Sequence, residues 1–154
     1  MKELNNPLNG AGLRVALVAG RFNDAISQEL IQGARDRLAS LAVEDEKVTL
    51  TWVAGAFEMP LAAQAMAKSG QFDAVICLGA VIRGETAHFD FVAGEAASGM
   101  MRVGLDTGVP VVFGVLTTDT FAQAFARAGV AEGNKGADCA EAAIEMVQLL
   151  NEMR

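Results

Sequence analysis

The residues best suited to chemistry stand directly after short apolar stretches of the chain. Residues 20–23 (GRFN), 55–60 (GAFEMP), 83–88 (RGETAH) and 117–120 (TTDT) each follow such a stretch. The third group contains His88, the single histidine of the 154 residues. Imidazole is the side chain best suited to moving protons near neutral pH, because it titrates there. Together these groups suit acid–base chemistry on a small anionic substrate.

We expect Gly84, Glu85 and Thr86 to bind an anion, and phosphate is the first choice. They stand between an expected strand and the start of an expected helix, where unpaired N–H groups and the helix dipole favour negative charge. His88, just beyond this loop, is open to two interpretations. It is either a proton-transfer group beside the anion or a surface residue at a helix end.

Four other side chains are also open to two interpretations. Phe22 either stacks on a flat heterocycle or only packs against its neighbours. Glu58 either recognises hydroxyl groups or only supplies a favourable acid in the first turn of a helix. Arg127 and Lys135 either bind an anion or remain solvated charges. The residue types alone leave these alternatives open.

Several familiar sites are excluded by what the sequence lacks. A single glycine follows the first apolar stretch, so the G-x-G-x-x-G dinucleotide motif is absent. Residues 85–86 (ET) stand where a P-loop requires Lys followed by Ser or Thr. One histidine and two distant cysteines do not make a usual zinc site, and no G-x-S-x-G nucleophile motif occurs. We therefore expect neither a metal nor a cofactor.

The composition narrows the class of protein further. A formal charge of −7 and a pI near 4.6 argue against a nucleic-acid partner. No apolar run approaches the ~20 residues of a membrane-spanning helix, and residues 1–13 lack a secretory signal, so we expect a cytoplasmic protein. Cys77 and Cys139 are expected to be reduced packing residues. With 52% hydrophobic residues, some apolar surface is expected to lie between subunits.

The elements that must position these residues alternate along the chain. Apolar runs at residues 14–19, 48–53, 74–82 and 109–116 predict strands, and their continuous apolarity predicts burial on both faces. Helical spacing of apolar residues over 26–41 predicts the first helix, and Pro60 suits the first turn of the second. Further helices are expected over about residues 89–106, 120–128 and 138–153. This order predicts one α/β domain, residues 14–154, with a parallel sheet between helices, preceded by an N-terminal arm, residues 1–13.

The motifs taken together resemble a known family. GRFN, GAFEMP, LGAVIRGETAHFDFV, FGVLTTDT, RAG and GNKG resemble, in order and spacing, the signature segments of lumazine synthases across nearly the whole chain. The most specific part is residues 79–86 together with His88. The resemblance implies a flavodoxin-like three-layer α/β/α sandwich with a four-stranded parallel sheet. It also implies a transferase that needs no cofactor or metal.

The implied reaction is the penultimate step of riboflavin biosynthesis. It condenses 5-amino-6-(D-ribitylamino)uracil with 3,4-dihydroxy-2-butanone 4-phosphate to 6,7-dimethyl-8-ribityllumazine and releases phosphate and water. The resemblance also implies roles: His88 shuttles protons, and Gly84, Glu85, Thr86 and Arg127 bind phosphate. The pyrimidine and ribityl chain would be bound by Phe22, Ala56, Phe57, Glu58, Ala80, Val81, Ile82, Phe113 and Lys135.

The resemblance further implies an assembly. Phe113, Arg127 and Lys135 would come from a neighbouring subunit, so we expect at least a pentamer, whose arms add to neighbouring sheets. The loop over residues 129–134 has no insertion, which allows twelve pentamers in a 60-subunit shell. Ala126 and residues 130–132 (VAE) depart from common family sequences, which bears on the setting of Arg127 and on the shell.

Two other functions follow from the same motifs. The chain could be a binding module that holds riboflavin or a lumazine, although the retained His88 and Arg127 speak against an idle pocket. It could also serve chiefly as a structural, shell-forming protein. An association with riboflavin synthase is consistent with the family resemblance.

Overall fold

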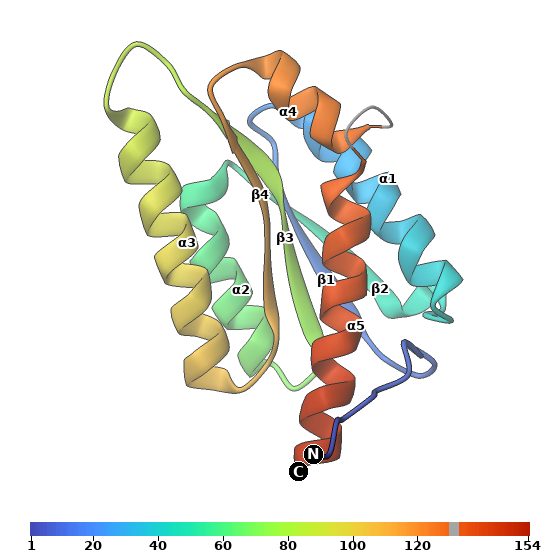
Figure 1. Ribbon diagram of the computed structural model, residues 1–154. Coiled ribbons are helices and arrows are strands. Elements are labelled where there is room, and N and C mark those ends of the chain that lie inside the picture. Colours follow the sequence, from blue (N-terminus) through green and yellow to red (C-terminus); the bar gives the residue numbers. More distant parts are fainter. Residues whose placement is uncertain (130–132) are drawn as a thin grey trace.

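Parallel strands and helices alternate along the chain (Figure 1). The computed structural model describes residues 1–129 and 133–154. Within these residues, two short 3-10 helices, η1 (Asp45–Lys47) and η2 (Ala56–Glu58), flank the second strand. The strands are β1 (Val15–Gly20), β2 (Val48–Val53), β3 (Ala74–Ile82) and β4 (Val111–Thr118). The α-helices are α1 (Asp24–Ser40), α2 (Met59–Lys68), α3 (His88–Thr107), α4 (Phe121–Ala128) and α5 (Lys135–Met153).

The strands form one parallel sheet in the order β2-β1-β3-β4. β1 lies in the middle, with Val15 paired to Val48 of β2 on one side and to Ala74 of β3 on the other. Figure 1 shows α2 and α3 on one face and α1, α4 and α5 on the other. This arrangement confirms the predicted flavodoxin-like three-layer sandwich.

The central strands bury both of their faces. In β1, Val15 and Leu17 belong to the core under α1 and α5, whereas Ala16 and Val18 belong to the core under α2 and α3. Successive side chains of a strand point to opposite faces, so a strand covered on both sides must be apolar at every position. The continuous apolarity of β1 and β3 has this cause.

Burial of β2 on both faces was predicted wrongly. Thr49 and Leu50 are exposed, because β2 is an edge strand whose outer side has no neighbour. The alternation of Thr with apolar residues in VTLTWV is typical of a half-covered strand. β4, at the other edge, is likewise only partly buried over its first three residues.

Several predicted element boundaries differ from the structure by one to three residues, two of them for a clear local reason. β1 begins at Val15 and ends at Gly20, one residue later than expected. β4 begins at Val111, two residues later than expected, because Pro110 has no N–H for the ladder. α5 begins at Lys135, three residues earlier than expected, because Asn134 caps it with a side chain that accepts a hydrogen bond from the N–H of Ala137.

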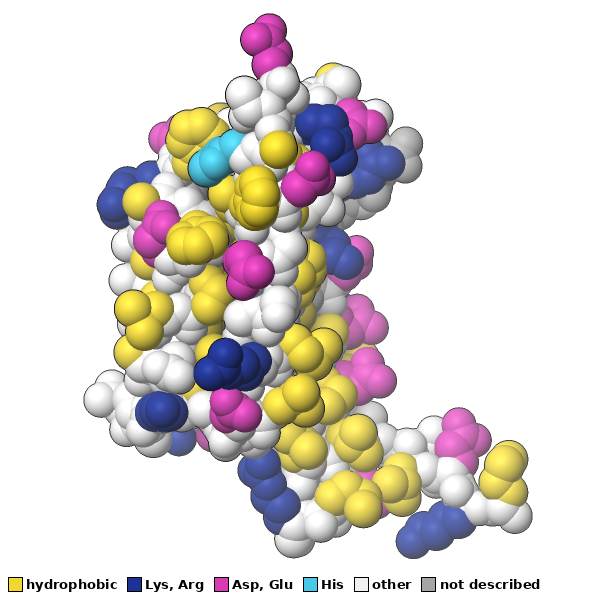
Figure 2. Space-filling view, turned by 90° about the vertical axis from the view of Figure 1, so that its left-hand side faces the viewer, with side chains coloured by type: hydrophobic (Ala, Val, Ile, Leu, Met, Phe, Trp, Pro, Cys, Tyr) yellow, Lys and Arg dark blue, Asp and Glu magenta, His cyan; other side chains and the backbone are white. Residues whose placement is uncertain are grey.

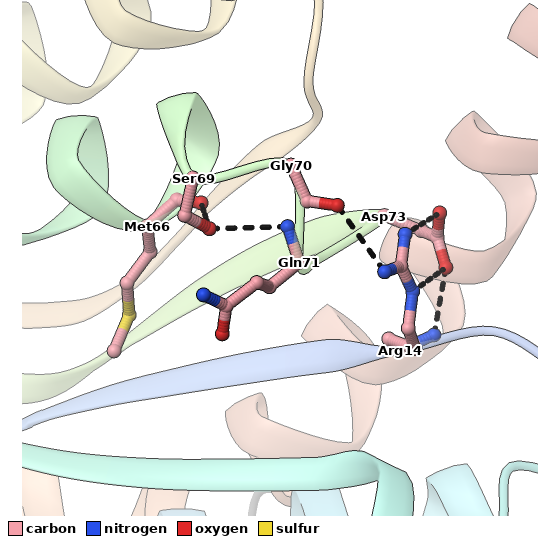
Figure 3. A network of polar contacts seen from close by, with 6 residues as sticks. All are labelled: Arg14, Met66, Ser69, Gly70, Gln71 and Asp73. Atoms are coloured by element: carbon pink, nitrogen blue, oxygen red, sulfur yellow. Dashed lines mark hydrogen bonds and ion pairs between the residues drawn. The ribbon is translucent and has the colours of Figure 1, made fainter.

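An ion pair fixes the amino-terminal ends of the two central strands (Figure 3). The N–H of Arg14 donates to Oδ2 of Asp73 at 2.8 Å, and the N–H of Asp73 donates to the carbonyl of Arg14 at 2.8 Å. The Arg14 guanidinium also contacts Oδ1 of Asp73 at 3.3 Å and the carbonyl of Gly70 at 3.2 Å. These contacts set the register of β1 against β3 at their amino-terminal ends, opposite the candidate site.

Residues 1–13 form neither helix nor strand. The N–H of Gly10 donates to the carbonyl of Leu41 at 2.6 Å, and Gln148 donates to the carbonyl of Asn9. The division into an arm and a domain stays a prediction. Among the described residues, no helix is long and apolar enough to cross a membrane.

Both cysteines are buried and unpaired. Burial, followed by the proximity of Cys139, raises the pKa of Cys77 to about 12. Burial also raises the pKa of Cys139 to about 11. Since the thiolate is the reactive form of cysteine, neither thiol serves as a nucleophile at neutral pH.

Candidate active site

A cleft of about 640 Å³ opens where β1, β2 and β3 end. This is the edge at which open parallel sheets bind ligands, and the volume lies in the range of small-molecule sites. Ten of the predicted site residues line it: Phe22, Ala56, Phe57, Glu58, Ala80, Val81, Ile82, Gly84, Thr86 and His88. Glu85 is exposed and is not among the lining residues.

The segment from Ala56 to Glu58 is held against the sheet by Met59. This side chain, the first of α2, is fully buried. A Cβ atom at Gly20 would lie 3.1 Å from Cε of Met59, and one at Gly79 would lie 3.0 Å from it. Glycine at the end of β1 and within β3 therefore lets α2 approach closely, and this approach places Ala56 and Glu58 on the cleft wall.

Phe22 is positioned by the turn that joins β1 to α1. Its N–H donates to the carbonyl of Ala54 at 3.0 Å, and the next residue, Asn23, is left-handed with φ 62° and ψ 46°. Asparagine tolerates this conformation better than most residues. The hydroxyl of Ser27 donates to the carbonyl of Gly20 at 2.6 Å and closes the turn. The ring of Phe22 is 75% exposed, so one wall of the cleft is an open aromatic face.

The predicted anion loop leads from β3 into α3. The N–H of Arg83 donates to the carbonyl of Thr118 at 2.9 Å, which anchors the start of the loop on β4. In the described part of the chain, the N–H groups of Gly84, Glu85 and Thr86 have no hydrogen-bond partner. Free amides before a 20-residue helix form a favourable environment for an anion.

Arg83 braces this loop, a role that the sequence reasoning missed. Its Nε lies 3.0 Å from Oδ1 of Asp119, and its Nη1 lies 3.6 Å from Oδ1 of Asp90. Its guanidinium carbon lies 4.3 Å from the ring centre of Phe89. The side chain thus joins the anion loop to the first turn of α3 and to the turn after β4. Two carboxylates already neutralise it, so it is poorly placed to bind substrate phosphate.

His88 is the first residue of α3, and its N–H lies 3.4 Å from Oγ1 of Thr86. The histidine stands among exposed hydrophobic side chains in Figure 2. Phe91 and Val92 also line the cleft, and sequence reasoning missed them. They follow His88 by three and four residues, the spacing that puts residues on one helix face. That spacing was the signal that could have identified them.

The remaining predicted residues lie in a second, separate hollow. Phe113, Arg127 and Lys135 line a space of about 340 Å³ beside the last residues of β4, together with Asp138. Arg127 comes from α4 and Lys135 begins α5. We call this space the β4 hollow. None of its lining residues is among those that line the cleft.

The charges of the two spaces are complementary. Among the described residues that line the cleft, Glu58 and His88 are the only ones with ionisable side chains, and none is Lys or Arg. The β4 hollow carries two cations. No group of three or more potential metal ligands occurs among the described residues. The arrangement of the cleft suits proton transfer and anion binding by backbone amides.

The fold and the cleft define an α/β protein with a small-molecule site at the carboxyl edge of its sheet. Residues 12–151 match the profile of the 6,7-dimethyl-8-ribityllumazine synthase family. A 6,7-dimethyl-8-ribityllumazine synthase of Protochlamydia amoebophila (strain UWE25) is 48% identical over 153 residues, covering 99% of this chain and 89% of the relative. The chain therefore belongs to the 6,7-dimethyl-8-ribityllumazine synthase family, a family of transferases in riboflavin biosynthesis. This confirms the resemblance seen in the sequence.

The position of His88 generates a prediction. His88→Ala should leave the fold intact and slow steady-state turnover of the family's condensation by roughly 10- to 10⁴-fold, the range being set by general acid–base catalysis. We expect the lower end, because the two substrates are intrinsically reactive. Gln71→Ala, at the opposite edge of the sheet, is the control. Unchanged turnover in the purified His88 variant would remove this residue from the mechanism.

Proposed function

We propose that this chain condenses 5-amino-6-(D-ribitylamino)uracil with 3,4-dihydroxy-2-butanone 4-phosphate to 6,7-dimethyl-8-ribityllumazine, releasing phosphate and water. Family membership supports this reaction. The observation that carries it is the combination, in one cleft, of an open aromatic face at Phe22, free amides at Gly84 and Thr86, and the imidazole of His88. These groups match a flat heterocycle, a phosphate and a series of proton transfers.

The chemistry needs protons moved several times at one place. The amino group of the uracil attacks the ketone carbon, and loss of water gives an imine. A proton then leaves the carbon chain, phosphate departs from the neighbouring carbon, and the resulting enol tautomerises. The ribityl-bearing nitrogen closes the ring with loss of a second water. His88, at the cleft wall beside the anion loop, accepts and returns these protons, and held geometry supplies much of the rate.

The substrate contacts follow from the walls of the cleft. Phe22 stacks on the pyrimidine, and the backbone of Ala80, Val81 and Ile82 binds the edge of its ring. Ala56, Phe57 and Glu58 line the ribityl chain. Gly84, Glu85 and Thr86 hold the phosphate through backbone amides and the dipole of α3.

We propose that a neighbouring subunit completes each site with its β4 hollow. The cleft has no cation of its own for a phosphate, whereas the hollow offers Arg127 and Lys135. Arg127 completes the phosphate site, because a guanidinium presents a planar pair of donors to phosphate oxygens. Lys135 and Phe113 reach the pyrimidine side. This assignment gives the cleft and the β4 hollow roles in the same reaction.

The exposed face of α2 and α3 supports an assembly. Leu61 is 73% exposed, Met101 65% and Leu105 76%, and Figure 2 shows hydrophobic side chains spread over this face. Large apolar residues gathered on one face mark an interaction surface.

We propose a pentamer in the cytoplasm, with arms that add to neighbouring sheets and twelve pentamers in a 60-subunit shell. An association with riboflavin synthase is the partner that this pathway suggests. Val130, Ala131 and Glu132, on which the shell prediction partly depends, lie outside the described residues.

The function is tested by mixing the two substrates with the purified chain. Formation of the fluorescent lumazine at a rate proportional to protein concentration is expected. The competing binding-module function predicts a different result. Finished lumazine would then bind and change its fluorescence, but the substrates would react no faster than without protein.

Arg127 generates a second prediction. Arg127→Ala should raise KM for the ketone phosphate by roughly 10- to 100-fold, since a lost charge-assisted contact costs about 1.5–3 kcal/mol. KM for the aminouracil should change little. Arg35→Ala is the matched control, because Arg35 pairs only with the exposed Asp45 at 3.0 Å. Equal weakening of both substrates would instead assign Arg127 to the interface or the fold.

Assembly generates a third prediction. The untagged 16.1 kDa chain should have a native mass of at least about five subunits, because head-to-tail contacts between two different surfaces of the chain can close into a ring. Native mass spectrometry and light scattering measure it. A mass of five subunits excludes the shell. A stable monomer with full activity contradicts the shared site itself.

A further inference from the structure

The side chain of Asn134 connects the start of α5 to α1 and to the end of α4. Its Nδ2 donates to the carbonyl of Ala128 at 2.8 Å and to the carbonyl of Glu29 in α1 at 3.0 Å. Its Oδ1 accepts from the N–H of Ala137 at 3.1 Å, which caps α5. Both N–H bonds of Nδ2 therefore donate to backbone carbonyls of two other helices, while Oδ1 caps α5.

Two glycines make room for this amide. A Cβ atom at Gly33 of α1 would overlap the amide group of Asn134, and a Cβ atom at Gly136 would overlap the carbonyl of Leu30. α5 and α1 can pack this closely only because both positions lack a side chain. The tight space leaves the Asn134 side chain in one place, between α1 and the end of α4.

The bonded atoms adjoin the two cations of the β4 hollow. Ala128 directly follows Arg127 at the end of α4, and Lys135 directly follows Asn134 at the start of α5. An isolated antiparallel bridge also pairs Ala128 with Asn134. The hydrogen bond from Asn134 to Ala128 thus spans the connection between α4 and α5 immediately beside both charges.

We propose that Asn134 is a positioning residue that fixes the distance between Arg127 and Lys135, so that the hollow arrives at a neighbour's cleft already shaped for the phosphorylated substrate. The inference rests on the proposed function, and it adds to it a residue that touches neither substrate. An ordinary N-cap needs only an acceptor for the helix amide. Asn134 goes further, because its amide nitrogen ties α4 and α1 to that cap.

The variant Asn134→Ser separates the two roles. Serine keeps a side-chain acceptor that caps α5, but it has no nitrogen to donate to Ala128 and Glu29. We expect KM for the ketone phosphate to rise about tenfold, a fraction of the loss expected for removing Arg127 itself. KM for the aminouracil should change less than about threefold, because serine still caps the start of α5 and so keeps Lys135 in place. kcat at saturation should also change less than about threefold, because His88 and the cleft are untouched.

A second variant disturbs the side chain of Asn134 from the α1 side. Gly33→Ala adds a methyl group that displaces the amide of Asn134, while alanine itself favours the helix. The same selective rise in KM for the ketone phosphate is expected. Gln32→Ala is the control, because Gln32 lies next to Gly33 but donates to Asp36 at 2.8 Å.

Mixed assemblies distinguish positioning across the interface from a damaged subunit. Asn134→Ser chains keep a sound cleft, and Phe22→Asp chains keep a sound hollow. When the two chains are co-expressed with different tags, half of the clefts and half of the hollows are sound, so about one quarter of the sites should combine a sound cleft with a sound hollow. kcat/KM for the ketone phosphate should then be about one quarter of the wild-type value. Each variant alone should fall well below this value.

The outcomes separate the inference from the proposed function. Normal KM values in Asn134→Ser, or mixed assemblies no better than the parent variants, overturn the positioning role while an active wild-type chain keeps the proposed function. A wild-type chain that forms no lumazine overturns both. A selective rise in KM for the ketone phosphate, together with recovery of kcat/KM in mixed assemblies, supports the positioning role of Asn134. A merely misfolded subunit would show neither.

Discussion

The pairing of β1 with β3 in the centre of the sheet is the constraint on which the rest of the structure depends. Both strands are buried on both faces, and fully burying a Val, Leu or Ile side chain contributes about 1.5–3 kcal/mol. A slip of one residue would move every side chain to the wrong core. The Arg14–Asp73 pair holds the register at the amino-terminal ends of the two strands. At their carboxyl-terminal ends, the same register brings Phe22 and the anion loop together.

A second principle is the division of charge between two surfaces of one chain. Arg83 lies nearest to the anion loop, yet its own carboxylate neighbours hold it. The cations Arg127 and Lys135 line the β4 hollow, at the ends of α4 and α5. In the proposed assembly, one face of the sandwich builds the chemistry of the cleft, and the other supplies the charge that a neighbour's cleft lacks. In this proposal the apolar face of α2 and α3 contributes to bringing chains together.

Much of the fold and the cleft could be predicted from the sequence, because both depend on local patterns. Apolar runs identified β1 and β3, Pro60 marked the start of α2, and motifs after each strand placed residues at one edge. The alternation of Thr with apolar residues was a local sign that β2 is only half covered, but its place at the edge depends on the strand order, which has no local signal. The roles of Arg83 and Asn134 depend on partners far along the chain, Asp119 and Glu29. Such pairs have no local signal.

The order of strands has a consequence for synthesis on the ribosome. β1 is made early, but its neighbour β3 follows only after β2 and α2, and α5, which packs on α1 and on the core beneath β1 and β3, is made last. One face of the most apolar strands is therefore only partly covered, by α1 and α4, until the final helix emerges. At a typical ~5–20 residues per second this exposure lasts seconds, long enough for chaperones or misassociation with other nascent chains to compete with folding. The net charge of −7 on the whole chain opposes such encounters between copies of this protein by mutual repulsion.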